Sequence, residues 1–188
     1  LPVFPEFGFQ PTGEQVRSAW GERTRALLVA SPANPTGTML SRDRIADLWR
    51  AVCDQGGLLV ADEIYQGLTY GTEAETALAF SDDVFVVNSF SKYFNMTGWR
   101  LGWLVVPDGC VRDIEKLAQN LFISASTPAQ HAALAAFAPE TITMLEARRA
   151  VDFAQNILKN LLTDTYEEWH RTTIVPTDTM VAMPEVVS

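Results

Sequence analysis

Residues 26–62 read ALLVASPANPTGTMLSRDRIADLWRAVCDQGGLLVAD, and this stretch decides the fold. It opens with an uninterrupted apolar run at 26–30 and closes with a second one at 58–61. Such runs, bounded by turn-forming residues, are typical of strands buried on both faces of a parallel sheet. Between them, Ser41 is placed to cap a helix whose apolar residues recur at helical spacing until two glycines end it. The stretch predicts a strand–helix–strand unit.

The same alternation continues on both sides of this unit. A short helix is predicted upstream, at 13–22, and apolar runs downstream predict two more strands, at 84–87 and 101–106. Three predicted helices then follow, at 111–121, 128–138 and 140–162, while the only strand signal in the tail is Thr173 to Val175. Strands that alternate with helices predict an α/β fold, with three α/β/α layers around a mostly parallel sheet.

Composition excludes several function classes. The chain has 188 residues, of which 47% are hydrophobic and 20% are charged, as in soluble globular domains. Its longest apolar stretches have the length of a strand, so we expect no membrane span. A net charge of −9 argues against nucleic acid and anionic membranes as partners, because phosphate-binding surfaces need clustered lysines and arginines. The N-terminus lacks the basic segment of a signal peptide.

The two cysteines, Cys53 and Cys110, have no metal-ligand spacing around them, and we predict no metal site. Cys53 falls within a helical pattern, which predicts a buried, reduced thiol. A reducing compartment, and hence a cytoplasmic location, is the corresponding expectation.

Polar residues gather where the predicted strands end. Asn34 follows the first strand, Asp62 ends the second, and Ser89 with Lys92 follows the third. Ligands of open α/β sheets bind outside the carboxyl ends of the strands, so these side chains predict a site. Strand ends are often polar for no functional reason, and this non-functional explanation is sufficient for any single one of these residues. The set is more informative because its members are chemically complementary.

The segments SFSK at 89–92 and MTGWRLG at 96–102 combine hydroxyls, a lysine and an arginine. Hydroxyls with a guanidinium suit a phosphate group, since arginine offers a planar fork of donors and a permanent charge. The lysine is compatible with a further phosphate ligand or with an amine nucleophile that attacks a carbonyl. Neither GxxxxGK[ST] nor GxGxxG occurs, so the nucleotide-binding fingerprints are absent.

Three motifs resemble those of class I/II aminotransferases, which are fold-type I enzymes dependent on pyridoxal 5'-phosphate (PLP). They are SPANPTG at 31–37, ADEIY at 61–65, and SFSK at 89–92 continued by GWRLG at 98–102. The motifs follow the family's order and approximate spacing, and the resemblance covers roughly residues 10–165. It implies a PLP-binding core of a large domain at 1–165, truncated at its front. Residues 166–188 would then begin the connection to a small domain or form an irregular tail.

The resemblance implies two central catalytic residues. Lys92 matches the lysine that forms an aldimine with PLP, and its amine can be held deprotonated in a site containing the cationic Arg100. Asp62 matches the carboxylate that pairs with the pyridine nitrogen and keeps it protonated. Glu63, the neighbour of Asp62, is interpreted as structural.

The resemblance also implies how the cofactor is held. Asn34 and Tyr65 match residues that hydrogen-bond its 3′ oxygen, and Tyr65 counts as catalytic for that reason. Ser89, Ser91 and Arg100 match the anchors of its phosphate. Each residue alone is also compatible with a turn, packing or a surface ion pair, and only the three motifs in register favour a site.

The implied activity is transfer of an amino group between an amino acid and a 2-oxo acid. Two alternatives remain open: a PLP-dependent lyase of the same fold, and a non-catalytic, aminotransferase-like effector-binding domain. Whole enzymes of this family are homodimers with a further N-terminal segment and a C-terminal small domain. That small domain carries the arginine that binds the substrate carboxylate, and Arg171 is not assigned this role. We therefore expect the 188-residue chain alone to be a poor catalyst.

Overall fold

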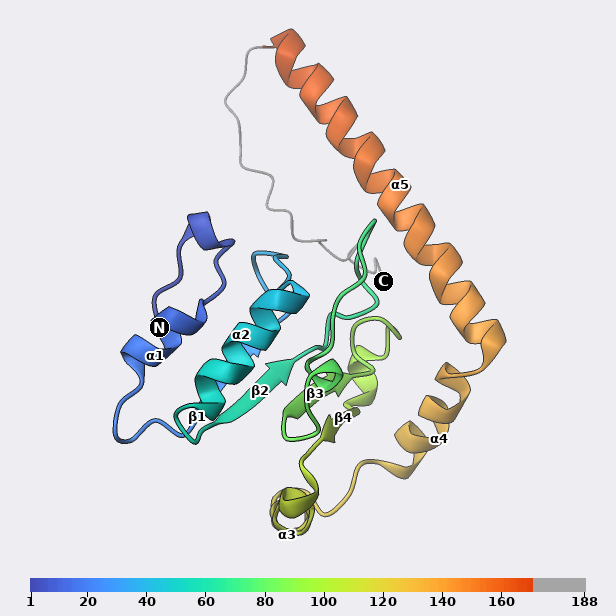
Figure 1. Cartoon of the computed structure of the whole chain (residues 1–188). Helices are drawn as coiled ribbons and strands as arrows, with labels where there is room; N and C mark the ends of the chain where they lie inside the picture. Colours follow the sequence, from blue (N-terminus) through green and yellow to red (C-terminus); the bar gives the residue numbers. More distant parts are fainter. Residues whose placement is uncertain (171–188) are drawn as a thin grey trace. The chain divides into compact units, whose positions relative to one another are not determined.

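The computed structural model describes the backbone of residues 1–170 and the side chains of residues 1–155 (Figure 1). The chain separates into two compact units, Leu1–Ala136 and a second one that begins at Phe137. The predicted strand from Thr173 lies outside the described residues. The division of the chain at residue 165 stays a prediction.

A four-stranded sheet forms the centre of the first unit. Its strands follow chain order: β1 (Ala26–Ala30), β2 (Leu58–Asp62), β3 (Phe85–Ser89) and β4 (Gly102–Val105). The first three strands are parallel, and β4 is antiparallel to β3. The predicted α/β fold with a mostly parallel sheet is therefore confirmed. Because β1, β2 and β3 are parallel neighbours, their carboxyl ends meet at one edge of the sheet.

The helices match their predicted positions to within a few residues, except that the last one continues to His170, eight residues beyond its predicted end at 162. The α-helices are α1 (Gly13–Ala19), α2 (Arg42–Cys53), α3 (Val111–Leu121), α4 (Thr127–Ala136) and α5 (Pro139–His170). Within residues 1–170, four 3₁₀ turns accompany them: η1 (Pro5–Phe7), η2 (Ala77–Ala79), η3 (Thr97–Trp99) and η4 (Asp108–Cys110). Within the described part of the chain, none of these helices combines the length and the apolar character that crossing a bilayer requires.

The core lies between α2 and one face of the sheet. Leu48 is fully buried, and it belongs to the same hydrophobic cluster as Val29 and Leu59 on the facing strands. Alternate strand residues point to the opposite face, where Leu28 pairs with Val60 and exposes 69% of its surface. The expectation that β1 is buried on both faces is therefore wrong for this chain. A second helical layer against that face stays a prediction.

Cys53 also differs from its prediction. It is the last residue of α2 and is exposed rather than buried, because it is turned about 100° around the helix axis from Val52, which belongs to the buried face. The pKa of its thiol is raised, mainly by desolvation and to a smaller extent by the negative charges of Asp54 and Asp83. Cys53 and Cys110 are both free.

Ser41 caps α2 as the sequence predicts. Its hydroxyl accepts a hydrogen bond from Arg44 N at 3.3 Å. Replacing Ser41 with alanine should lower the free energy of unfolding by about 1 kcal/mol, because one helix N–H then loses its partner. Ser41→Gly should lower the free energy of unfolding by only ~0.3 kcal/mol. Urea unfolding of both variants checks the ranking, and equal stabilities would contradict the assigned cap.

Candidate functional site

The predicted site residues lie in loops at the carboxyl edge of the parallel strands. Asn34 lies in the loop after β1, Asp62 ends β2, and Ser89 ends β3. Main-chain hydrogen bonds join the carboxyl ends of the three strands. Ser31 N donates to Asp62 O at 3.0 Å, and Glu63 N donates to Val87 O at 2.9 Å. The first residues of each loop therefore keep the geometry of the sheet.

Three of the predicted side chains meet directly. Asn34 Nδ2 donates a hydrogen bond to the Tyr65 hydroxyl at 3.2 Å, and Lys92 Nζ lies 5.2 Å from the centroid of the Tyr65 ring. The three residues come from three different loops, separated by about thirty residues each in sequence. Asn34 is exposed, whereas Tyr65 and Lys92 are half-buried. The amine is thus held against an aromatic ring and remains accessible.

A second group of predicted residues surrounds the turn between β3 and β4. Ser91 N donates to Ser89 Oγ at 3.0 Å, and Ser89 Oγ donates to Leu101 O at 3.2 Å. Thr97 Oγ1 donates to Ser91 O at 2.7 Å, and Arg100 Nη1 donates to Thr97 O at 3.0 Å. Hydrogen bonds through Thr97 therefore tie the exposed Arg100 to the segment that carries both serines.

Thr97 was not among the predicted site residues, although it lies within the quoted motif. Arg100, to which it is bonded, adopts a left-handed backbone conformation with φ 53° and ψ 50°. That conformation is uncommon for residues other than glycine and is found where the surrounding structure enforces it. The turn is thus a defined structure rather than a loose connection.

Asp62 is placed by its own loop. Its Oδ1 accepts a hydrogen bond from Ile64 N at 3.1 Å, and its side chain is half-buried. In the sheet, Asp62 lies between Ala30 and Val87. The hydrogen bonds described for Asp62 do not reach Tyr65 or Lys92. The structure therefore places the carboxylate at the same sheet edge without joining it to the other two side chains.

Glu63 is the buried polar residue that the sequence interpretation left as structural. It exposes 3% of its surface, and its Oε1 accepts a hydrogen bond from Ala77 N at 2.7 Å. Burial raises the pKa of the Glu63 carboxyl, and hydrogen bonds from Ala77 N and from the side chains of Thr76 and Gln66 oppose that rise. A single sequence gives no signal for this contact, because its partner lies fourteen positions away.

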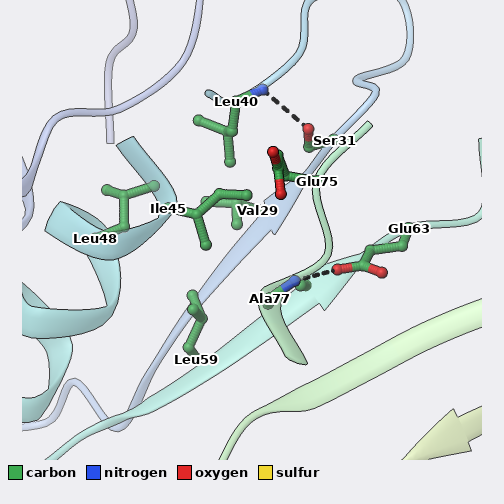
Figure 2. A pocket seen from close by; sticks show the side chains of 10 residues that line it. Val29, Ser31, Leu40, Ile45, Leu48, Leu59, Glu63, Glu75 and Ala77 are labelled. Carbon is green, nitrogen blue, oxygen red and sulfur yellow. Dashed lines mark hydrogen bonds between the residues drawn. The ribbon is translucent and has the colours of Figure 1, made fainter. Parts of the chain in front are cut away.

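A pocket lies beside this carboxylate, on the face of the sheet that α2 covers (Figure 2). Its lining is mostly apolar and includes Ile45, Leu48 and Leu59, with Glu63 and Glu75 as its carboxylates. None of the seven predicted site residues lines it. We interpret this pocket as part of the core rather than as the functional site. Across the described residues, no group of histidines, cysteines and carboxylates is arranged to hold a metal ion.

Gly102, the first residue of β4, supports the serine loop through a close backbone approach. A Cβ at this position would lie 2.6 Å from Asn88 O, which is main chain and cannot rotate away. Gly102→Ala should therefore lower the free energy of unfolding by about 1–3 kcal/mol. Gly98→Ala is the matched control, because a Cβ there meets nothing within 4 Å. Thermal or urea unfolding distinguishes the two, and equally stable variants would contradict the packing described here.

Taken together, the edge offers a primary amine, a carboxylate, a phenol, an amide, hydroxyls and a guanidinium. These groups suit a small anionic ligand that also carries an electrophilic carbon, because the hydroxyls and guanidinium bind the anion and the amine attacks the carbon.

Comparison with known proteins agrees with this chemistry. A profile of the family "Aminotransferase class I and II" matches residues 2–185. The valine–pyruvate aminotransferase of Mycobacterium tuberculosis is 38% identical over 181 residues, which are 95% of this chain and 45% of that protein. The (5-formylfuran-3-yl)methyl phosphate transaminase of Methanocaldococcus jannaschii is 38% identical over 143 residues, 74% of this chain and 36% of that protein.

Solved structures give the same result. An aminotransferase from Mycobacterium tuberculosis superposes with a TM-score of 0.75 at 38% identity, covering 82% of this chain and 43% of that chain. Aspartate aminotransferase from Thermus thermophilus with maleate superposes with a TM-score of 0.78 at 32% identity, covering 86% and 44%. The chain thus spans less than half the length of these relatives. The family profile and these likenesses show that the chain belongs to the class I and II aminotransferases.

Proposed function

We propose that this chain is the PLP-binding part of an aminotransferase that transfers an amino group between an amino acid and a 2-oxo acid in a ping-pong cycle. The contact of Lys92 with Tyr65, and of Tyr65 with Asn34, carries the proposal. It brings an amine nucleophile and two hydrogen-bonding groups from three loops to one place. The membership of the chain in the aminotransferase family supports the same activity.

The chemistry of the donor set fits PLP. When bound, PLP supplies an aldehyde that a primary amine attacks and a ring that withdraws electrons from the substrate. Lys92 Nζ would bond to the cofactor covalently and, once a substrate amine had displaced it, would carry a proton between the substrate α-carbon and the cofactor. Asp62 would hold a proton on the ring nitrogen, since a negative partner favours the charged form. Asn34 and Tyr65 would orient the cofactor through its 3′ oxygen.

The phosphate of the cofactor would lie at the β3–β4 turn. Ser91 and Arg100 offer a hydroxyl and a guanidinium there, and Thr97 connects the main chain of Ser91 to the guanidinium of Arg100. Ser89 Oγ, which donates to Leu101 O in this structure, would exchange that bond for one to the phosphate. A charged donor with two hydroxyls binds a phosphate more strongly than neutral donors alone. Because Lys92 follows Ser91 directly, the phosphate grip would also fix the position of the amine.

The identity of the amino donor is left open by this proposal. One relative is named a valine–pyruvate aminotransferase and others are named aspartate aminotransferases, and all are similar to this chain at 30–38% identity. We also propose a cytoplasmic location, supported by the two free cysteines, and a homodimeric state.

Product analysis of the whole protein that carries this chain tests the activity. The protein is supplied with PLP, a 2-oxo acid and a panel of amino acids labelled with ¹⁵N at the α-amino group. An aminotransferase places the label in a new amino acid derived from the 2-oxo acid, which mass spectrometry detects. Release of the label as free ammonia together with pyruvate, or its retention in a cyclised product, would instead identify a lyase and contradict the proposal.

A further inference from the structure

Glu63 is a carboxylate buried next to the site without being part of it. Its own main chain continues the sheet, since Glu63 N donates to Val87 O at 2.9 Å. Its side chain crosses to the far end of the following loop and accepts a hydrogen bond from Ala77 N at 2.7 Å, as the dashed line in Figure 2 shows. Ala77 exposes only 2% of its surface and begins η2. The bond therefore joins two fixed points of the core.

The loop closed by this bond, residues 63–77, contains Tyr65 near its start. Gln66 N donates to Glu63 O at 3.0 Å, and Gln66 Nε2 donates to Glu75 O at 3.0 Å. The carboxylate of Glu63, its carbonyl and the side chain of Gln66 thus fasten both ends of the loop together. Tyr65 lies between the two residues that make these bonds. Tyr65 therefore lies within the segment that these bonds close.

Packing alone does not explain a carboxylate at this position. Burying an ionisable group is unfavourable unless its hydrogen bonds compensate, so an apolar side chain would fill the same space at lower cost. What the carboxylate adds is an acceptor that reaches a main-chain N–H fourteen positions away. That acceptor restrains the loop that presents the Tyr65 hydroxyl to Asn34 Nδ2 and the Tyr65 ring to Lys92 Nζ.

We propose that Glu63 is a positioning residue whose carboxylate closes loop 63–77 and thereby holds Tyr65 against Asn34 and Lys92. The inference rests on the proposed function, because Tyr65 matters to the reaction only if PLP binds beside it. Glu63 itself touches neither Asn34 nor Lys92 among the described contacts, and it acts on them through Tyr65.

The test compares Glu63→Ala, Glu63→Gln and the control Glu73→Ala in the full 188-residue chain. Glu73 is an exposed carboxylate on the same loop, so its removal changes the charge equally without opening the loop. The first measurement, made without PLP, is hydrogen exchange at Gln66, Leu68 and Ala77, whose amides donate hydrogen bonds within the loop. Glu63→Ala should raise their exchange rates about tenfold, because the Ala77 amide loses its acceptor and the loop opens, and should leave β2 and β3 unchanged.

The second measurement is the pH midpoint at which bound PLP changes its absorbance. Glu63→Ala should shift this midpoint in the same direction as Tyr65→Phe, and should shift it little further in a chain that already carries Tyr65→Phe. Glu63→Gln keeps an acceptor for Ala77 N and should restore both measurements to near the wild-type values. If Glu63→Ala does not fold, Glu63→Asp replaces it, because its shorter side chain does not reach Ala77 N.

The outcomes separate this inference from the function on which it rests. A wild-type chain that binds no PLP would overturn the proposed function, and the inference with it. If the wild-type chain binds PLP and Glu63→Ala leaves both exchange and midpoint unchanged, the positioning role is wrong. Equal shifts of the midpoint with and without Tyr65→Phe would also overturn it, because Glu63 would then act independently of Tyr65.

Discussion

Replacing Lys92 with alanine is expected to abolish the covalent attachment of PLP to this chain. The wild-type chain mixed with PLP should develop a new absorbance band, and borohydride should fix the cofactor to the peptide that contains Lys92. The variant should show no fixed cofactor at that peptide, because the remaining partners of the site offer hydrogen bonds but no primary amine. Its fold should persist, since Lys92 is half-buried and lies outside the two hydrophobic clusters.

Lys116→Ala is the matched control for this experiment. Lys116 is an exposed lysine on α3 whose Nζ pairs with Asp113 Oδ1 at 2.9 Å, so its removal also deletes one primary amine. Exposed pairs of this kind contribute about 0–1 kcal/mol, and the control should bind PLP as the wild-type chain does. Mass spectrometry of the digested, reduced chains locates the cofactor. Cofactor fixed mainly to Lys116 or to other exposed lysines would show that the reaction is non-specific and that Lys92 has no special role.

The sheet and its helices could largely be predicted from sequence because their patterns are local. The two apolar runs of the strand–helix–strand unit became β1 and β2, and Ser41 directly precedes α2, where its hydroxyl bonds to a helix N–H. The direction of β4 could not be predicted, since an apolar run does not encode the direction of a strand. The connection from Ser89 to Gly102 contains only a 3₁₀ turn, whereas a parallel return commonly needs a crossover helix.

Burial was predicted less well than secondary structure, because it depends on what packs against each face. The run that became β1 indicates two apolar faces, yet Val29 is buried under α2 while Leu28 is exposed. Cys53 shows the same limit at the end of a helix, because helical spacing alone does not reveal that this residue lies to one side of the buried face that includes Leu48 and Val52.

The candidate site likewise combines residues that local motifs predict with residues whose contacts appear only in the folded structure. Sequence placed Asn34, Tyr65 and Lys92 together because they match family motifs, and their contacts are described by the structure. Glu63 and Thr97 act over contacts that sequence spacing does not reveal. Glu63 reaches Ala77 across a loop, and Thr97 links Arg100 to a serine segment through main-chain oxygens. Such supporting contacts decide how firmly a site is held, and they become visible only when the backbone is folded.

Replacing Asp62 with asparagine should weaken PLP binding by about 10- to 100-fold, because a charge-assisted hydrogen bond to the ring nitrogen contributes about 1.5–3 kcal/mol. Asparagine keeps the size of the side chain and an oxygen that can accept from Ile64 N, the hydrogen bond that places Asp62 in this structure. The loss should therefore come from the missing charge and not from a displaced loop. Asp82→Asn removes one charge at an exposed position before β3 and should leave the dissociation constant unchanged. Absorbance titration with PLP measures both constants, and an Asp62→Asn chain that binds as tightly as the wild type would remove this carboxylate from the proposed site.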